Sequence, residues 1–219
     1  MGVDSVLNRQ ARVGAVIDST TVAHNFAWMR PNDLVYSYVV NNWLLGNDPP
    51  AFDVLAWNDD ATNLSATFSR DTNAMLASGA AIEPGRLTAL GTPIHLSRVT
   101  GDNFLVAGLT DHITTWRPCY QTSQLLGGDS DVVIVNSGHI QSFVNPVGTS
   151  RYRYWAGPAG GPDPDAWLAG AQEHQGSWWP RWSEWLLARS GESKPTPTRL
   201  GNAAHPAREA APGRYVHEK

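Results

Sequence analysis

The chain contains 219 residues, of which 42% are hydrophobic and 16% are charged, and its formal net charge at pH 7 is −4. A chain of this length can bury a sizeable core, and its acidic balance lacks the basic footprint that a nucleic-acid partner requires. Its single cysteine, Cys119, is typical of a reducing compartment, and no apolar stretch reaches the ~18 residues of a transmembrane helix, so we expect a cytosolic protein without a transmembrane segment.

The first part of the chain predicts helices and loops without a series of strands. Within it, residues 34–46 (LVYSYVVNNWLLG) predict a helix with Asn32 or Asp33 as its N-cap and Gly46 as its C-terminal stop. Apolar residues run almost all the way round this helix, so we expect it to be buried or to face a partner.

After residue 88 the pattern changes to that of an α/β sheet. Residues 93–99 (PIHLSRV) and 103–108 (NFLVAG) have the length and composition of strands. Residues 113–128 predict a helix with Pro118 in its first turn, and residues 131–135 (DVVIV) predict a buried parallel strand. This order of strand, helix and strand predicts a βαβ unit in a parallel sheet.

The end of the chain predicts one more strand and two closing helices. The strand covers residues 151–157, and the helices cover 163–174 and 177–191. The second helix presents a stripe of tryptophans on one face, which we interpret as core packing. Residues 192–219 are polar and rich in proline, so they should be extended or poorly ordered. The stripe consists of Trp178, Trp182 and Trp185.

Two ionisable residues follow consecutive predicted strands. Asp111 lies in the turn after residues 103–108, and His139 in the turn after residues 131–135. The carboxyl ends of parallel strands meet at one edge of a sheet, so the two turns should lie side by side. Asp111 can then orient the imidazole of His139, whose other nitrogen takes a proton from a nucleophile. The alternative is that Asp111 caps the next helix and His139 is incidental.

The chain order of nucleophile, Asp and His is that of α/β-hydrolases, but the nucleophile is missing. No G-x-S-x-G elbow, or its cysteine form, occurs in the sequence. The string GGDSD at residues 127–131 lacks the second glycine and precedes a strand. Cys119 lies within a predicted helix and is better interpreted as a small buried hydrophobe. No metal site is predicted, because the aspartates at 48, 53, 59 and 60 lack the spacing of a calcium loop and have no His or Cys partners.

Four segments carry a resemblance to a known family. Together they resemble the C-terminal half of polyhydroxyalkanoate (PHA) synthases, and most closely the type that polymerises medium-chain monomers. The resemblance covers nearly the whole chain, including its polar end. The segments are residues 30–64 (RPNDLVYSYVVNNWLLGNDPPAFDVLAWNDDATNL), 106–128 (VAGLTDHITTWRPCYQTSQLLGG), 136–146 (NSGHIQSFVNP) and 197–219 (PTRLGNAAHPAREAAPGRYVHEK).

The resemblance implies an α/β-hydrolase fold and a set of roles. Residues 1–88 would be part of a helical cap, residues 89–190 the C-terminal part of the catalytic core, and residues 191–219 a polar tail. In this family an elbow cysteine attacks the thioester of a 3-hydroxyacyl-CoA. Asp111 of TDHI and His139 of SGHI would be the Asp and His of the Cys-Asp-His triad. Coenzyme A is part of the substrate and a product, so no cofactor is implied.

The resemblance also implies how the chain works with partners. His139 would activate the thiol, and Asp111 would orient His139 or help deprotonate the 3-hydroxyl of the incoming monomer. Apart from the resemblance, His112 lies next to Asp111 and could help to shape the substrate site, or it could equally be a turn histidine satisfied by backbone groups. The cysteine would lie on an N-terminal half that this chain lacks. A fragment of this kind would dimerise with that half, with a full-length synthase or with itself, at the surface of a cytoplasmic polyester granule.

Two alternatives belong to other functional classes. The chain could be a non-catalytic protein that binds the granule or the synthase, in which case the edge carrying Asp111 and His139 would serve only as an interaction surface. It could also be a PHA depolymerase or esterase of the same fold. The depolymerase alternative requires the same missing nucleophile. Whichever of these functions holds, the tryptophan stripe could touch the surface of a polyester granule instead of packing in the core.

Overall fold

The computed structural model describes residues 16–29, 31–49, 62–211 and 213–214. These residues belong to two compact units. One consists of Met1–Asn103 and Gln121–Asp129, and the other of Phe104–Tyr120 and Ser130–Lys219.

Short helices and two-stranded pairs make up the described part of the first unit. Helix α4 shows how its sequence sets its ends, because the hydroxyl of Ser65 accepts a hydrogen bond from the amide of Phe68 and Gly79 ends the helix with φ +62°. Strands β1 and β2 pair antiparallel, as do β3 and β4. In chain order the elements are β1 (Val16–Ile17), α2 (Ser19–Met29), the π-helices η1 (Asn32–Tyr36) and η2 (Val39–Leu44), β2 (Leu64–Ser65), α4 (Ala66–Ser78), the 3-10 helix η3 (Ala80–Ile82), β3 (Thr88–Ala89), β4 (Thr92–Pro93) and the 3-10 helix η4 (Leu96–Arg98).

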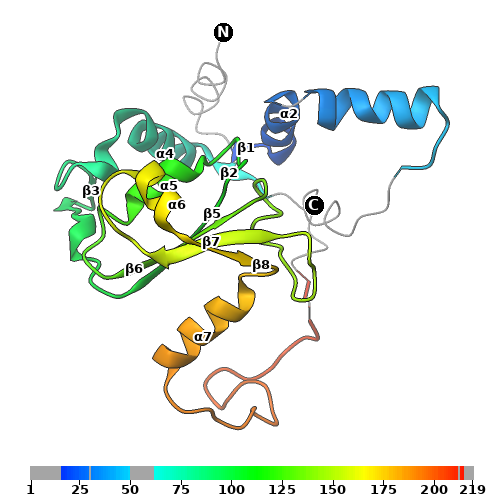
Figure 1. The fold of residues 1–219 in the computed structure, drawn as a ribbon. Coiled ribbons are helices and arrows are strands. Elements are labelled where there is room, and N and C mark those ends of the chain that lie inside the picture. The colour runs from blue at the N-terminus through cyan, green and yellow to red at the C-terminus, as the bar shows by residue number, and fades with distance from the viewer. Residues whose placement is uncertain (1–15, 30, 50–61, 212, 215–219) are drawn as a thin grey trace. The chain divides into compact units, whose positions relative to one another are not determined.

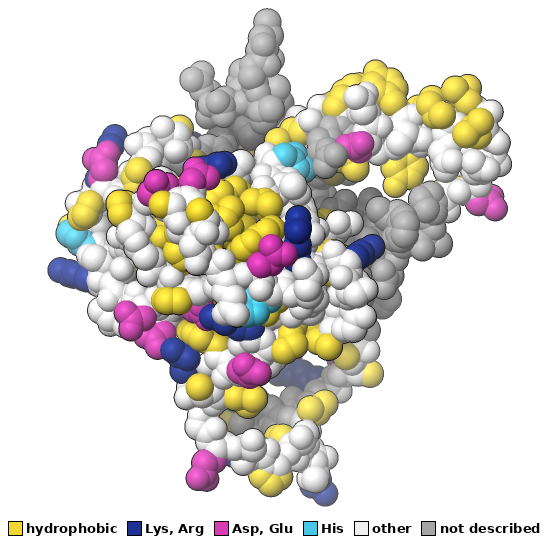
Figure 2. Space-filling model, in the orientation of Figure 1, with side chains coloured by type: hydrophobic (Ala, Val, Ile, Leu, Met, Phe, Trp, Pro, Cys, Tyr) yellow, Lys and Arg dark blue, Asp and Glu magenta, His cyan; other side chains and the backbone are white. Residues whose placement is uncertain are grey.

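Residues 31–44 are helical without a break, mostly in π-helical geometry (η1 and η2), so the helix that the sequence predicts here is confirmed. The first begins at Asn32, after Pro31, without a side-chain cap, so the predicted N-cap is wrong. Gly46 follows with φ +69°, as expected of a helix stop. Trp43 is 84% exposed, and Figure 2 shows hydrophobic side chains over this helical segment. The prediction that this helix is buried is therefore wrong among the described residues. An all-round apolar pattern leads to burial only where other elements surround the helix.

A predicted strand over residues 93–99 is also wrong. Strand β4 ends at Pro93, and η4 follows at Leu96–Arg98. The turn is stabilised because the carbonyl of Val99 accepts a hydrogen bond of 2.9 Å from the amide of Gly127. Gly127 itself is required at this contact, because a Cβ there would meet the backbone of Ser97. Residues 97–99 are thus held by close backbone contact with Gly127 and not by pairing with a strand.

The second unit contains a four-stranded mixed sheet with helices on both faces. The strand order is β5-β6-β7-β8. Figure 1 shows α5 and α6 on one face of this sheet and α7 on the other. The elements are β5 (Asn103–Gly108), α5 (Trp116–Thr122), β6 (Ser130–Val135), β7 (Arg153–Pro158), α6 (Pro164–Gly170), β8 (Gln172–Gln175) and α7 (Trp179–Ser190).

The fold is α/β, as predicted, but its sheet is mixed and not parallel throughout. Strands β5, β6 and β7 lie where the sequence predicts strands, whereas β6 with β7 and β7 with β8 pair antiparallel. Parallel neighbours need a long crossover, usually a helix packed on the sheet. The connection from β6 to β7 contains turns and no helix among its described residues, which explains the antiparallel return.

Strand β6 separates two hydrophobic clusters, one on each face of the sheet. Its four valine and isoleucine residues alternate between the faces, as a strand buried on both sides requires. The cluster beside α5 and α6 contains Ala107, Trp116, Tyr120, Val132 and Ile134, and the cluster beside α7 contains Val133, Val135, Tyr154, Ala156 and Trp178. The tryptophan stripe joins the second cluster through Trp178, while Trp182 is 40% exposed, so core packing is confirmed for part of the stripe.

The segment predicted as a helix over residues 163–174 divides into a helix and a strand. Helix α6 ends at Gly170, and Ala171 is already extended with ψ 146°. Strand β8 then pairs with β7, opposite Ala156 and Tyr154. Hydrogen bonds to a neighbouring strand therefore outweigh the local helix preference of these residues.

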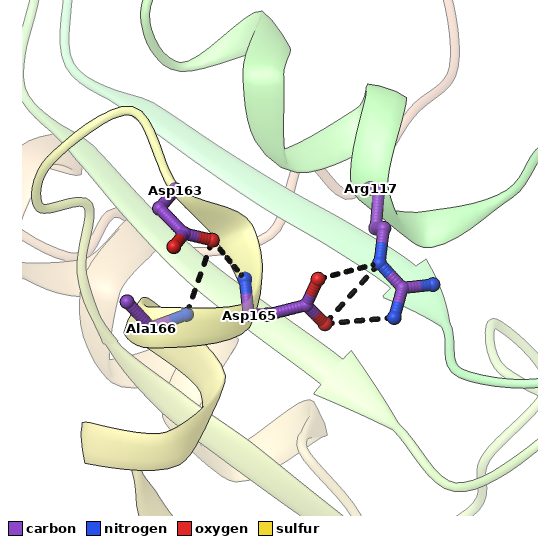
Figure 3. A network of polar contacts seen from close by, with 4 residues as sticks. All are labelled: Arg117, Asp163, Asp165 and Ala166. Carbon is purple, nitrogen blue, oxygen red and sulfur yellow. Dashed lines mark hydrogen bonds and ion pairs between the residues drawn. The ribbon is translucent and has the colours of Figure 1, made fainter.

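An ion pair connects α5 to α6, as Figure 3 shows. The guanidinium of Arg117 donates to both carboxylate oxygens of Asp165, with Nη2–Oδ1 at 2.7 Å and Nε–Oδ2 at 2.9 Å. Asp163 caps α6 by accepting from the amides of Asp165 and Ala166. Both partners of the ion pair are exposed, so it contributes little to the stability of the fold.

Beyond α7 the described residues form neither helix nor strand, apart from one bridge between Gly201 and Pro206. The described tail residues, 192–211 and 213–214, follow an irregular course with bends and turns, and in one turn the amide of Asn202 donates to the carbonyl of His205 at 2.9 Å. The expectation of an extended or poorly ordered tail stays a prediction. In the described part of the chain, no helix is both long and apolar enough to cross a membrane.

Candidate active site

Asp111 is held in a tight turn directly after β5. Its amide donates to the carbonyl of Gly108 at 3.1 Å. Its carboxylate oxygen Oδ1 accepts from the amides of Ile113 at 2.8 Å and Thr114 at 2.9 Å. Such an Asx turn satisfies two backbone amides with the carboxylate, and the described backbone continues through bends until α5 begins at Trp116. The carboxylate side chain is only 3% exposed.

His139 lies in the loop after β6 and contacts Asp111 directly. Its ring nitrogen Nδ1 is 2.8 Å from Oδ2 of Asp111. The expectation that the two strand-end turns lie side by side is therefore confirmed. The His139 side chain is 40% exposed. With Nδ1 directed at the carboxylate, Nε2 is the ring nitrogen available for proton exchange with another group.

Backbone contacts hold the two turns against each other. The amide of Leu109 donates to the carbonyl of Val135 at 2.8 Å, and that of Thr110 to the carbonyl of Ser137 at 3.2 Å. Gly108 packs so closely on the His139 loop that a Cβ there would lie 2.6 Å from the carbonyl oxygen of Ser137. Main-chain packing therefore brings the turn of Asp111 and the loop of His139 together.

A methyl group at Gly108 should separate these turns. We expect Gly108→Ala to lower the free energy of unfolding by about 1–3 kcal/mol, because a small-to-large change at a tight contact forces the backbone to move. Urea unfolding measures this cost. Gly157→Ala, at a glycine whose Cβ would meet no atom within 4 Å, is the matched control and should change stability much less. Equal effects of both variants would contradict the packing argument.

The environment of Asp111 favours its charged form. Burial by itself raises the pKa of the Asp111 carboxyl, but the hydrogen bonds from His139, Thr114 and Ile113 outweigh burial, and the pKa lies below its ordinary value. A carboxylate that stays charged suits the role of orienting an imidazole and stabilising an imidazolium.

This lowered pKa has a consequence for acid stability. Asp111 contributes stability that is complete above the unfolded pKa of about 3.9 and is lost as pH falls through its lower folded pKa. We therefore expect the free energy of unfolding of Asp111→Asn to fall less between pH 5 and pH 2 than that of the unchanged chain. Urea titrations at each pH provide the test, with the exposed Glu192→Gln as control. Parallel pH profiles for Asp111→Asn and the unchanged chain would contradict it.

Cys119 has the properties of a structural thiol. It packs against the cluster beside α5, and its Sγ lies 3.9 Å from the carbonyl oxygen of Thr114. Burial, and secondarily the charge of Asp111, raise the pKa of this thiol above its ordinary value. An activated nucleophile requires a lowered pKa, so the raised pKa agrees with the interpretation of Cys119 as a packing residue, although its side chain is only partly buried.

We expect Cys119 to react slowly with iodoacetamide. In the native chain at pH 7.5 its rate should be at least about fivefold below that of the same thiol in urea, because thiolate is scarce and access is limited. The unfolded chain serves as the internal control. A native thiol that reacts faster than the unfolded one would identify an activated cysteine and would reopen its role as the nucleophile.

The other predicted features take no part in this contact. His112 is exposed on the same turn as Asp111, and its role in substrate binding stays a prediction. Among the described residues, no group of three His, Cys, Asp or Glu side chains is arranged to hold a metal ion. Of the aspartates considered for a metal, those at positions 53, 59 and 60 lie outside the described residues.

The sequence predicts none of the contacts that hold the His139 loop. Ser142 is fully buried in this loop, and the indole of Trp178 donates to the carbonyl of Ser142 at 2.7 Å. The sequence feature that could have indicated these contacts is Ser177-Trp178-Trp179, at the N-terminal end of α7, because a buried indole needs an acceptor for its N–H.

Comparisons with known proteins give strong matches. The chain is 47% identical over 211 residues to poly(3-hydroxyalkanoate) polymerase 1 of Ectopseudomonas oleovorans, covering 96% of this chain and 38% of that protein. It is 49% identical to polymerase 2 of the same organism, covering 95% of this chain and 37% of that protein. Poly(3-hydroxyalkanoate) polymerase subunit PhaC of Cupriavidus necator is 40% identical, with 94% and 35% covered. The chain thus spans less than two-fifths of the length of these relatives. No family model matches.

Proposed function

Because the chain belongs to the poly(3-hydroxyalkanoate) polymerase family, as the counterpart of the C-terminal part of its members, we propose that it supplies the acid–base residues of an acyltransferase site. In this proposal Asp111 and His139 belong to a Cys-Asp-His triad, and the polypeptide adopts the C-terminal part of an α/β-hydrolase fold. The cysteine comes from a segment outside these 219 residues.

The contact between Asp111 Oδ2 and His139 Nδ1, at 2.8 Å, carries the proposal. It follows two neighbouring strands, β5 and β6, at the edge of the sheet where α/β enzymes place their reactive groups. The carboxylate is almost completely buried and the imidazole is partly exposed. This difference suits a carboxylate that orients and an imidazole that exchanges protons.

The proposed reaction proceeds in two proton-coupled steps. His139 Nε2 takes the proton of the cysteine thiol, and the thiolate attacks the thioester carbonyl of a 3-hydroxyacyl-CoA. The bond from that carbonyl to the sulfur of coenzyme A breaks, and the leaving thiolate takes the proton from His139. The 3-hydroxyl of a further monomer then gives its proton to His139 and attacks the acyl group on the cysteine. One ester bond forms, the bond from the acyl carbon to the cysteine sulfur breaks, and the cysteine thiolate takes the proton back from His139.

A free sheet edge supports the idea that another segment completes the site. Among the described strands, β5 lies at one end of the sheet, and it carries Phe104, Leu105 and Val106. An apolar edge strand of this kind pairs readily with a further strand. A strand added parallel to β5 would end next to the turn that holds Asp111, where the proposed elbow would lie.

The remaining elements of the proposal follow from the family. The substrate is a 3-hydroxyacyl-CoA, coenzyme A is a product, and no other cofactor takes part. The partners are the missing polymerase segment or a full-length synthase, in a homo- or heterodimer at the surface of a cytoplasmic polyester granule. The relatives described above are named as polymerases, which favours polymerisation over the depolymerase alternative.

Reconstitution tests the proposal. The 219-residue chain alone should release no thiol from 3-hydroxyacyl-CoA, because it lacks an elbow nucleophile. Co-expression with the N-terminal part of polymerase 1 of Ectopseudomonas oleovorans should restore release of coenzyme A, detected with a thiol reagent. Release by the chain alone that survives Cys119→Ser would contradict the proposal, because it would require a different nucleophile.

A further inference from the structure

The loop that carries His139 is held by three successive side chains at the start of α7. Each of them donates a hydrogen bond to a carbonyl of the loop, so three loop residues are tied to one helix end. The bonds run from Ser177 Oγ to Asn145 O, from Trp178 Nε1 to Ser142 O at 2.7 Å, and from Trp179 Nε1 to Phe143 O at 3.0 Å.

Trp178 is the most firmly fixed of these donors. The residue is 6% exposed and belongs to the hydrophobic cluster beside α7. Its ring stacks on Phe104 of β5 with centroids 6.0 Å apart and meets Trp182 edge-on. Because a buried indole held in this way has no alternative acceptor in water, its N–H fixes the position of the Ser142 carbonyl.

Ser142 continues this connection to the histidine. It is completely buried, and both its amide, at 3.0 Å, and its hydroxyl, at 2.7 Å, donate to the carbonyl of Gly138. Gly138 is the residue directly before His139. A displacement of Ser142 therefore moves the peptide group from which the imidazole projects.

We propose that Trp178 and Ser142 are positioning residues that keep Nδ1 of His139 directed at Asp111, through the chain of hydrogen bonds from the indole to the Ser142 carbonyl and from Ser142 to Gly138. This inference rests on the proposed function of His139. It assigns a polar role to a tryptophan whose apolar ring also packs in the core. A catalytic proton acceptor must be held within a few tenths of an ångström of its working position, so the hydrogen bonds that fix the His139 loop matter for the proposed reaction.

The test measures the His139 ring directly in the 219-residue chain. With ¹⁵N-labelled histidine, and His139→Gln to assign the signal, the hydrogen bond to Asp111 is followed through the Nδ1 proton and its exchange with water. Trp178→Phe keeps an aromatic ring and removes the donor, whereas Ser142→Ala removes the hydroxyl bond to Gly138. Trp182→Phe makes the same aromatic change one turn further along α7 and is the control.

We expect Trp178→Phe and Ser142→Ala each to accelerate exchange of the Nδ1 proton by roughly five- to tenfold, the change that loss of one hydrogen bond implies, while Trp182→Phe leaves it unchanged. Wild-type exchange in folded Trp178→Phe and in Ser142→Ala would overturn the proposal. The same acceleration in Trp182→Phe would also overturn it, because ring packing would then be the cause. If Trp178→Phe does not fold, Ser142→Ala decides. An inactive reconstituted pair with the expected exchange rates would contradict the proposed function alone.

Discussion

Replacement of His139 by alanine in the reconstituted polymerase is expected to lower the rate of coenzyme A release by about 10⁴-fold, because the triad loses the group that accepts the thiol proton. The side chain is partly exposed and its Nδ1 lies 2.8 Å from Asp111, so its removal should affect catalysis far more than folding. The measurement is thiol release from 3-hydroxyacyl-CoA by the pair of polypeptides.

This experiment also separates the proposed enzyme from a non-catalytic binding protein. A binding protein needs no imidazole, so His139→Ala would leave every property of the pair intact. His24→Ala, at a histidine of helix α2, is the matched control and should keep near-normal activity. Activity retained by the His139 variant would exclude the triad, provided that the variant and the control fold equally well in urea titrations.

Asp111→Asn is expected to lower the same rate by about 10³- to 10⁴-fold. The asparagine oxygen can still accept from the amides of Ile113 and Thr114, as Oδ1 of Asp111 does. Its amide nitrogen then faces Nδ1 of His139 and donates to it. This bond selects the tautomer with its proton on Nε2, and such an imidazole cannot take a proton from a thiol.

Asp165→Asn provides the comparison for this change. Asp165 pairs with Arg117 on the exposed side of α5 and α6 (Figure 3), so the same chemical change there should alter the rate by less than about threefold. The turn geometry of Asp111→Asn should survive, which urea unfolding at pH 7 verifies. A rate near that of the unchanged pair would show that the carboxylate does not select the tautomer.

The site is predictable from the sequence because it depends on strand ends. Strands β5 and β6 each have a compact apolar run followed by polar turn residues, and that pattern places Asp111 and His139 at one edge of the sheet. Their contact follows from neighbouring strands and needs no knowledge of side-chain packing. The Asx turn of Asp111 is not predicted from the sequence. Residues 113–115 have the composition of a helix, so the sequence places them in the helix that follows, which begins only at Trp116.

Features that depend on long-range contacts were not predictable in the same way. The turn at η4 follows from the bond between Val99 and Gly127, and β8 follows from pairing with β7. Local residue preferences contain neither partner. The π-helices η1 and η2 likewise differ from an α-helix only in hydrogen-bond register, which hydrophobic periodicity does not resolve.

The Asx turn of Asp111 has a consequence for how a divided polymerase would assemble. Its carboxylate is anchored by the amides of Ile113 and Thr114 as well as by His139, so it adopts its geometry before any thiol arrives. Little reorganisation then accompanies association, and recovery of activity after mixing should be limited by the encounter of the two polypeptides. Its rate would rise in proportion to the concentration of the added partner.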